Sequence, residues 1–76
     1  MMILDSIKPG KPFLVVKPYC IQTYDGKYFT YKNGDLMIAL ECTAKHNGNY
    51  WSFLTSKGEI ISLRDFNAVD YLQEAP

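Results

Sequence analysis

The segment 34–65, GDLMIALECTAKHNGNYWSFLTSKGEIISLRD, constrains the fold more than any other part of the chain, because it predicts three consecutive strands. From Leu36 to Thr43 the residues alternate between two faces, a period of two that is typical of a half-buried strand. Further strands are predicted over Tyr50–Thr55 and Glu59–Arg64. Asn and Gly in 45–49, and Gly58 in 56–58, suit the tight turns between these strands. The sequence therefore predicts an antiparallel meander.

The predicted core combines one face of this meander with a strand on either side of it. Phe13–Val16 is aromatic and β-branched and predicts a first strand, after two prolines in 8–12 interrupt regular structure. The apolar residues that we expect to be buried are Phe13, Val15, Leu36, Ile38, Leu40, Phe53, Ile61, Leu63 and Val69.

The segments outside these strands are less regular. Tyr19–Asn33 contains Asp25-Gly26, a dipeptide that favours a tight hairpin turn, so a short two-stranded ribbon is expected around it. Residues 65–68 predict a single helical turn, with Asp65 accepting hydrogen bonds from its free amides. Residues 69–73 fit either a closing strand, which we favour, or a continuation of the helix.

Size and charge set the limits on function. The 76 residues make one domain, in which 1–11 is an N-terminal extension, and the net charge is zero. A chain this small has little room for a deep, dry active site beside its core, which disfavours an enzyme. The charges are uneven, since residues 1–34 carry five Lys and two Asp whereas 35–76 carry three basic and six acidic residues.

The cysteines and the N-terminus indicate a reducing, cytoplasmic setting. Cys20 and Cys42 are too few for a disulfide scaffold, and both are expected to be buried as small apolar residues. Met1–Leu4 is too short for the apolar region of a signal peptide. No apolar run approaches the length of about 20 residues that a membrane helix needs, so no membrane partner is expected.

The order of these elements resembles an SH3 domain over roughly residues 12–73. In that family the second strand typically opens with an apolar residue, two further positions, Gly-Asp and alternating apolar residues, which Tyr31–Asp35 and the residues after it match. Paired aromatics typically open the third strand, here Tyr50-Trp51, and Gly58 stands in the turn before the fourth. The resemblance implies a five- to six-stranded SH3-like barrel with a long first loop and a single 3₁₀ turn near the C-terminus.

Several family motifs are missing from this chain. Val15–Tyr19 stands where the family has Ala-Leu-Tyr-Asp-Tyr, and 63–67 lacks the usual Pro-Ser-Asn-Tyr. The long loop has Asp25 as its only acid, whereas the family has an acidic cluster that pairs with proline-rich ligands. Related small barrels of the Tudor-like and KOW types share the strand order and serve nucleic-acid or polymerase partners.

Aromatic residues are the best candidates for a binding surface. Tyr and Trp bury a large area with few rotatable bonds and keep a polar group for hydrogen bonding. The resemblance places a groove between the long loop and the start of the third strand. Alternation requires that either Tyr50 or Trp51 points inward. The residues expected to bind a partner are Tyr19, Tyr24, Tyr50, Trp51 and Tyr71.

A second surface would suit nucleic acid. Lysine and tyrosine interleave in the segment 27–32, as expected where bases stack on rings and lysines contact phosphates. The residues of this alternative are Lys27, Tyr28, Tyr31 and Lys32. The neutral net charge and the lack of Arg in this segment argue against it, because specific nucleic-acid binders are usually markedly basic.

No catalytic or metal-binding motif is present. His46 is the only histidine, and its place in a predicted turn indicates an exposed loop residue. The sequence therefore predicts a non-enzymatic module without a cofactor that docks on another protein, such as an accessory or inhibitory factor of phage type. A KOW-like module associated with nucleic acid or a polymerase is the alternative, and a small hydrolase or transferase is least favoured.

Overall fold

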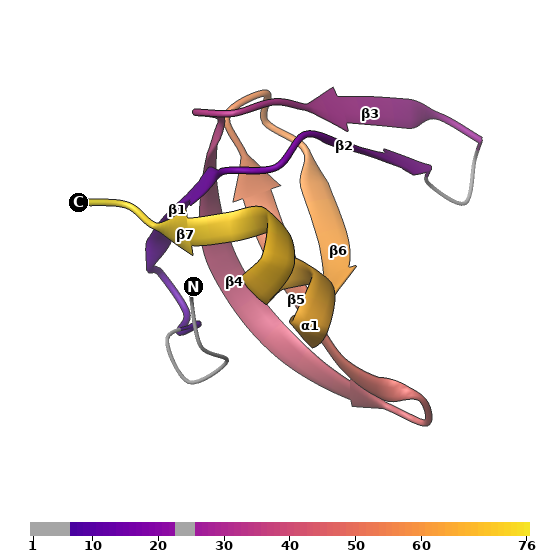
Figure 1. Ribbon diagram of the computed structural model, residues 1–76. Helices are drawn as coiled ribbons and strands as arrows, with labels where there is room; N and C mark the ends of the chain where they lie inside the picture. The colour runs from indigo at the N-terminus through magenta and orange to yellow at the C-terminus, as the bar shows by residue number, and fades with distance from the viewer. Residues whose placement is uncertain (1–6, 23–25) are drawn as a thin grey trace.

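A computed structural model of the chain describes residues 7–22 and 26–76. Strands make up most of the described chain, which confirms the predicted all-β class (Figure 1). The elements in chain order are β1 (Pro12–Val15), β2 (Tyr19–Gln22), β3 (Tyr28–Tyr31), β4 (Leu36–Lys45), β5 (Gly48–Thr55), β6 (Ile60–Arg64), α1 (Asp65–Tyr71) and β7 (Leu72–Glu74).

Two antiparallel sheets organise the molecule. The larger has the strand order β6-β5-β4-β1-β7, and the predicted meander forms its β4, β5 and β6. The smaller is the hairpin of β2 and β3, in which Tyr19 pairs with Tyr31 and Gln22 with Tyr28. The hairpin crosses one end of the larger sheet, and α1 lies in front of that sheet (Figure 1). The ribbon expected around Asp25-Gly26 is confirmed by these strands, although its tip lies outside the described residues.

The sheets do not close into the expected five- or six-stranded barrel. Seven strands are present in the described chain, and β6 pairs only with β5. The reason is local, because β2 and β3 satisfy their ladder hydrogen bonds with each other rather than with the open edge of the larger sheet. The strand β6 therefore ends the sheet with one unpaired edge.

The core lies between the inner face of the larger sheet, the helix and the hairpin. Phe13 and Phe53 are fully buried and meet edge to face, with ring centroids 6.1 Å apart. Of the predicted core, Phe13, Val15, Phe53, Ile61 and Leu63 are buried, and Val69 is half-buried against them. The other buried apolar residues are Ile7, Tyr31, Met37, Ala39, Ala68 and Leu72.

The prediction of which face of β4 is buried is wrong. Met37 and Ala39 are fully buried, whereas Leu36 is 40% exposed, and Ile38 and Leu40 are half-buried. Both faces of this strand carry apolar residues, so alternation divides them into two sets without saying which set points inward. The pairing decides it, because Phe13 of β1 lies opposite Met37 and shares its face.

A bulge in β4 limits the alternation further. The register with β5 shifts between Ala39 and Glu41, so Leu40 is the extra residue. Such a bulge bends the strand and changes which side chains point inward beyond it. Cys42 lies past the bulge and is exposed, as is Cys20, so the expected burial of both cysteines is also wrong.

The C-terminal segment combines the two predicted alternatives. A seven-residue α-helix replaces the expected single 3₁₀ turn, and the strand begins only at Leu72. Burial of Ala68 against the sheet stabilises the added turn. Asp65 Oδ1 accepts a hydrogen bond from the Phe66 N–H at 2.7 Å, as expected for a residue at the helix start. The strand β7 then pairs with β1.

The described part of the N-terminal extension belongs to the same domain. Ile7 is buried in the core. The Gly10 N–H donates to the Ala39 carbonyl at 2.7 Å, and the Ala39 N–H donates to the Lys11 carbonyl at 3.0 Å. These bonds attach the extension to β4 next to its bulge.

Candidate functional site

A groove runs between the hairpin and the β6 edge of the larger sheet. It consists of two depressions of about 540 and 350 Å³ that share Ile21, Tyr50 and Ser62. We call it the aromatic groove, and its lining residues are Tyr19, Cys20, Ile21, Gln22, Lys45, Tyr50, Ile60, Ile61, Ser62, Leu63, Arg64, Phe66, Asn67 and Tyr71.

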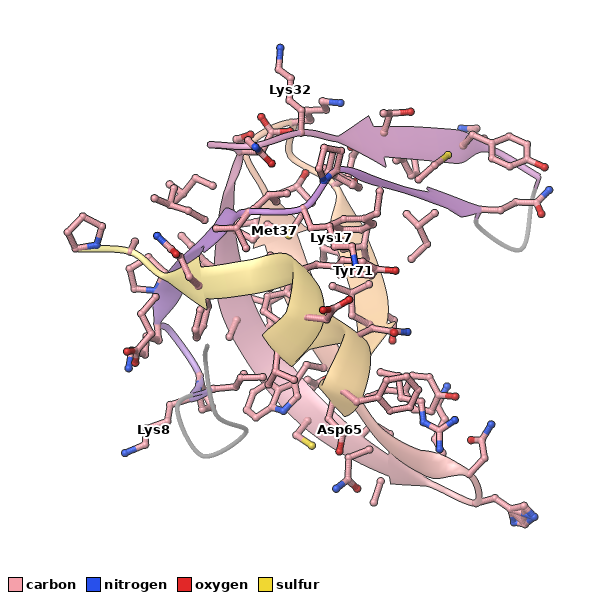
Figure 2. All side chains as sticks on the ribbon, viewed as in Figure 1. Lys8, Lys17, Lys32, Met37, Asp65 and Tyr71 are labelled. Atoms are coloured by element: carbon pink, nitrogen blue, oxygen red, sulfur yellow. The ribbon has the colours of Figure 1, made fainter. Side chains whose placement is uncertain are left out.

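A stacked pair of tyrosines lines one part of the groove, and a third tyrosine packs behind this pair in the core. The rings of Tyr19 and Tyr71 are almost parallel, with centroids 4.6 Å apart, and Tyr31 lies on the other side of Tyr19 at 5.3 Å. The Lys17 ammonium lies 5.7 Å from the Tyr71 ring centroid and pairs with Asp70 at 3.0 Å (Figure 2). The stack joins β2, β3 and α1, so it fixes the hairpin to the rest of the domain.

Burial, together with the hydrogen bond from Tyr31 to Glu59, keeps the phenols of Tyr19 and Tyr31 protonated. The Tyr19 hydroxyl contacts Met37 Sδ at 3.4 Å, and the Tyr31 hydroxyl donates to Glu59 Oε1 at 3.2 Å. Burial raises the pKa of Tyr31 to about 12, and the Glu59 carboxylate adds to this rise. Burial also raises the pKa of Tyr19, with the neighbouring Tyr31 adding to the effect. Both side chains are therefore uncharged at neutral pH and unsuited to act as bases.

The outer wall of the groove carries two cations on aromatic rings. The Lys45 ammonium lies 4.8 Å from the Tyr50 ring centroid, and the Arg64 guanidinium lies 4.8 Å from that of Phe66. Arg64 Nε is buried and has no hydrogen-bond partner among the described residues. Phe66 is 53% exposed, so this wall offers both apolar surface and positive charge to a ligand.

Three of the five residues predicted for partner binding line the groove together. Tyr19, Tyr50 and Tyr71 come from β2, β5 and α1. Trp51 lies elsewhere, because it points to the inner face of β5 and packs on the core, as alternation required of one residue of the pair. Tyr24 lies outside the described residues.

Of the four residues of the nucleic-acid alternative, three are exposed and one is buried. Tyr31 is 1% exposed and belongs to the core, so its ring has no free face on which a base could stack. Tyr28 is 67% exposed on β3, and Lys27 and Lys32 are also exposed. None of the four lines the aromatic groove.

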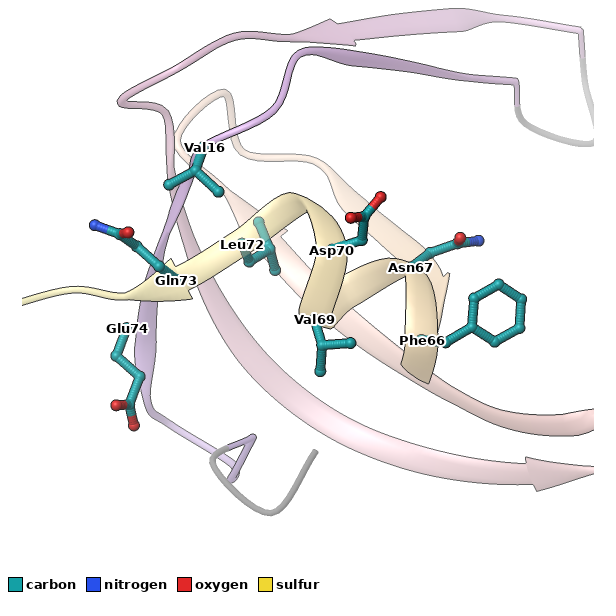
Figure 3. Close-up of a pocket in the computed structure, with 8 residues that line it drawn as sticks. All are labelled: Val16, Phe66, Asn67, Val69, Asp70, Leu72, Gln73 and Glu74. Atoms are coloured by element: carbon teal, nitrogen blue, oxygen red, sulfur yellow. The ribbon is translucent and has the colours of Figure 1, made fainter. Parts of the chain in front are cut away.

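A larger depression of about 910 Å³ lies over α1 and β7. Its side chains come from one helix, the adjoining strand and Val16, and they point in different directions (Figure 3). It is therefore a less suitable candidate than the aromatic groove, where residues from four separated segments face a common space.

Sequence reasoning missed the residues of the outer wall. Arg64 is the only arginine of the chain, and an aromatic residue, Phe66, follows it by two positions. Both facts were available as signals of a binding surface, since Arg and aromatic residues are enriched at interfaces. Their proximity to Tyr50 becomes visible only through the pairing of Tyr50 with Arg64 across β5 and β6.

The groove is lined mainly by aromatic, apolar and cationic side chains. The described residues contain no cluster of His, Cys, Asp or Glu that could hold a metal ion. His46 is exposed in the turn between β4 and β5, as predicted. Within residues 7–22 and 26–76, no helix has the length and apolar character needed to span a membrane. Comparison with protein-family models, curated proteins and solved structures found no match to this chain.

Proposed function

We propose that this chain is a non-enzymatic module that docks on another protein through the aromatic groove. One observation carries the proposal, namely that Tyr19, Tyr50 and Tyr71 line a single groove although they lie far apart in the sequence. Tyrosines that converge from separate elements supply the rigid, amphipathic contact area that binding surfaces use.

Further features support this reading and its setting. The strand order β6-β5-β4-β1-β7, with a hairpin between β1 and β4, is consistent with the SH3-like arrangement that the sequence resembles. Both cysteines are free and exposed, which fits a reducing, cytoplasmic compartment. In this proposal the module acts as an accessory or inhibitory factor of phage type, and a KOW-like module associated with nucleic acid or a polymerase is the alternative.

The cysteines provide a direct test of the docking surface. Cys20 lines the groove, whereas Cys42 does not. A photoreactive maleimide is attached to Cys20 in a Cys42→Ser variant and to Cys42 in a Cys20→Ser variant. After nuclease treatment, irradiation in cell lysate is expected to give a discrete protein adduct from Cys20 and none from Cys42.

Two tyrosine substitutions make the test specific. Tyr50→Ala is expected to abolish the adduct, whereas Tyr28→Ala changes an exposed tyrosine outside the groove and leaves it intact. Equal adducts from both cysteines, or equal tolerance of both substitutions, would contradict the proposal. An association that nuclease removes and that Tyr28→Ala weakens would instead favour the nucleic-acid alternative.

A further inference from the structure

The groove follows the edges of two strands rather than the face of a sheet. All five residues of β6, Ile60–Arg64, line it, and so do all four residues of β2, Tyr19–Gln22. A depression on a sheet face would be lined by alternate residues only, because successive side chains point to opposite faces. The groove therefore runs between one unpaired edge on β6 and one on β2.

The hydrogen-bond pattern shows what the β6 edge presents to the groove. The Thr55 N–H donates to the Glu59 carbonyl at 2.8 Å, which makes these residues a hydrogen-bonded pair. Such pairs alternate with non-bonded ones along an antiparallel ladder, and the register between β5 and β6 has no break. The backbone N–H and C=O groups of Ile60, Ser62 and Arg64 therefore point away from β5.

The groove is positively charged although the protein is neutral. Its lining includes Lys45 and Arg64 but no Asp or Glu. In the described part of the chain, neither cation forms a salt bridge, since both ion pairs involve other lysines. Arg64 therefore offers a guanidinium without an ionic partner among the described residues, and guanidinium groups bind carboxylates in a bidentate geometry.

From these observations we infer that the groove binds an extended, acidic segment of the partner protein as an added strand on β6. The outward groups of Ile60 and Ser62 would hold its backbone, and Arg64 would bind one of its carboxylates. Addition of a strand to an open edge is a common mode of peptide recognition. A nucleic-acid strand would match the charge but could not continue the peptide ladder. The inference rests on the proposed docking function and specifies its ligand.

The probe is a peptide selected from a random 12-residue display library on the whole protein and then synthesised with blocked ends. Glu and Asp are expected to be enriched among the selected sequences. Amide hydrogen exchange, measured by NMR, is expected to slow about tenfold or more at Ile60, Ser62 and Arg64 when this peptide is bound. The amides of Ile61 and Leu63 already bond to β5, so they serve as internal controls.

Substitutions on both molecules test the carboxylate contact. Arg64→Gln is expected to weaken binding about tenfold or more, whereas Lys32→Gln removes a charge outside the groove and should change it less than about twofold. Replacing the selected peptide's Glu by Gln should weaken binding to the natural chain but not to Arg64→Gln, which isolates this pair.

Several results would overturn the inference. The selection could yield no peptide above background, or peptides that are not enriched in Glu and Asp. The β6 amides could stay unprotected in the complex, or the protein could bind a dT12 oligonucleotide and no peptide. If a protein adduct forms from Cys20 while the β6 amides stay unprotected, the added strand is refuted and the docking function stands. If the adduct also fails to form, both are refuted.

Discussion

The Arg64 guanidinium lies directly against the backbone of Gly48, where a Cβ atom would come within 2.8 Å of Nε. Gly48 begins β5 and has a φ of 135°, a conformation that L side chains rarely adopt. This contact orients the guanidinium between the β4–β5 hairpin and the Phe66 ring. The glycine therefore has a role in positioning the cation of the groove as well as in the turn.

Gly48→Ala is expected to destabilise the fold and to displace Arg64. The backbone strain costs about 1–3 kcal/mol, and the clash with the guanidinium adds to it. Gly58→Ala is the matched control, because Gly58 also has a positive φ but nothing within 4 Å of its added Cβ. Urea unfolding should show the larger loss for Gly48→Ala, and only this variant should weaken peptide binding. Equal effects of both variants would mean that the Arg64 contact is unimportant.

Substitutions in β4 test which of its faces is buried. Met37 is fully buried, so Met37→Ala is expected to lower the free energy of unfolding by about 2–5 kcal/mol. Leu36 is 40% exposed, so Leu36→Ala should cost much less, about 1 kcal/mol. Chemical denaturation of the two variants compares neighbours in the same strand. A larger loss of unfolding free energy for Leu36→Ala than for Met37→Ala would indicate that the opposite face of β4 is buried.

Thr55 is a buried polar residue that stabilises the turn before β6. Its hydroxyl accepts hydrogen bonds from the N–H groups of Lys57 and Glu59, both at 3.2 Å. Thr55→Val keeps the shape and leaves these donors without the hydroxyl, so unfolding should become easier by about 1–3 kcal/mol. Thr55→Ser retains the hydroxyl and should recover part of this loss in the same unfolding assay. If Thr55→Val and Thr55→Ser have the same free energy of unfolding, the two hydrogen bonds contribute nothing to stability.

The two buried phenols predict a loss of stability at alkaline pH. The pKa of Tyr31 is raised to about 12 by burial and by Glu59, and burial raises that of Tyr19. In the unfolded chain both ionise near pH 10, so above this pH the native state holds protons that the unfolded state has lost. The free energy of unfolding should therefore be insensitive to these groups below about pH 10 and fall toward pH 12.

Denaturation at a series of alkaline pH values measures this effect. Tyr31→Phe removes one of the two phenols and should make the fall shallower, at the cost of the hydrogen bond to Glu59. Tyr28→Phe removes an exposed phenol instead and is the matched control. The explanation fails if the free energy of unfolding falls with pH equally steeply in Tyr28→Phe and Tyr31→Phe.

The sequence was sufficient to predict the meander because its signals are local. Alternating residues and turn-forming Asn and Gly define β4, β5 and β6 within one continuous segment. Alternation correctly predicted that Tyr50 and Trp51 lie on opposite faces of β5, so that one of the two rings points inward. The convergence of Tyr19 and Tyr71 on Tyr50 followed from the resemblance, since nothing local connects these residues.

The predictions that were wrong concern positions whose structure is determined by tertiary contacts and not by the local sequence. Leu36 and Met37 are equally acceptable as core residues, and only the pairing with Phe13 selects Met37. The length of α1 was underestimated because it depends on the burial of Ala68 against the sheet, which the local sequence does not show. The contact of Arg64 with Gly48 could not be foreseen from the sequence, because it depends on the pairing that places the start of β5 beside the end of β6.

The pairing of β1 has a consequence for how the chain folds. Phe13 lies opposite Met37 on one side and opposite Glu74 on the other. The hairpins of the meander need only short loops to form, whereas β1 pairs with strands that are distant along the chain. Closing such long loops is slow, and folds dominated by them reach the native state in milliseconds to seconds. We therefore expect the pairing of β1 with β4 and β7 to limit the rate at which this protein folds.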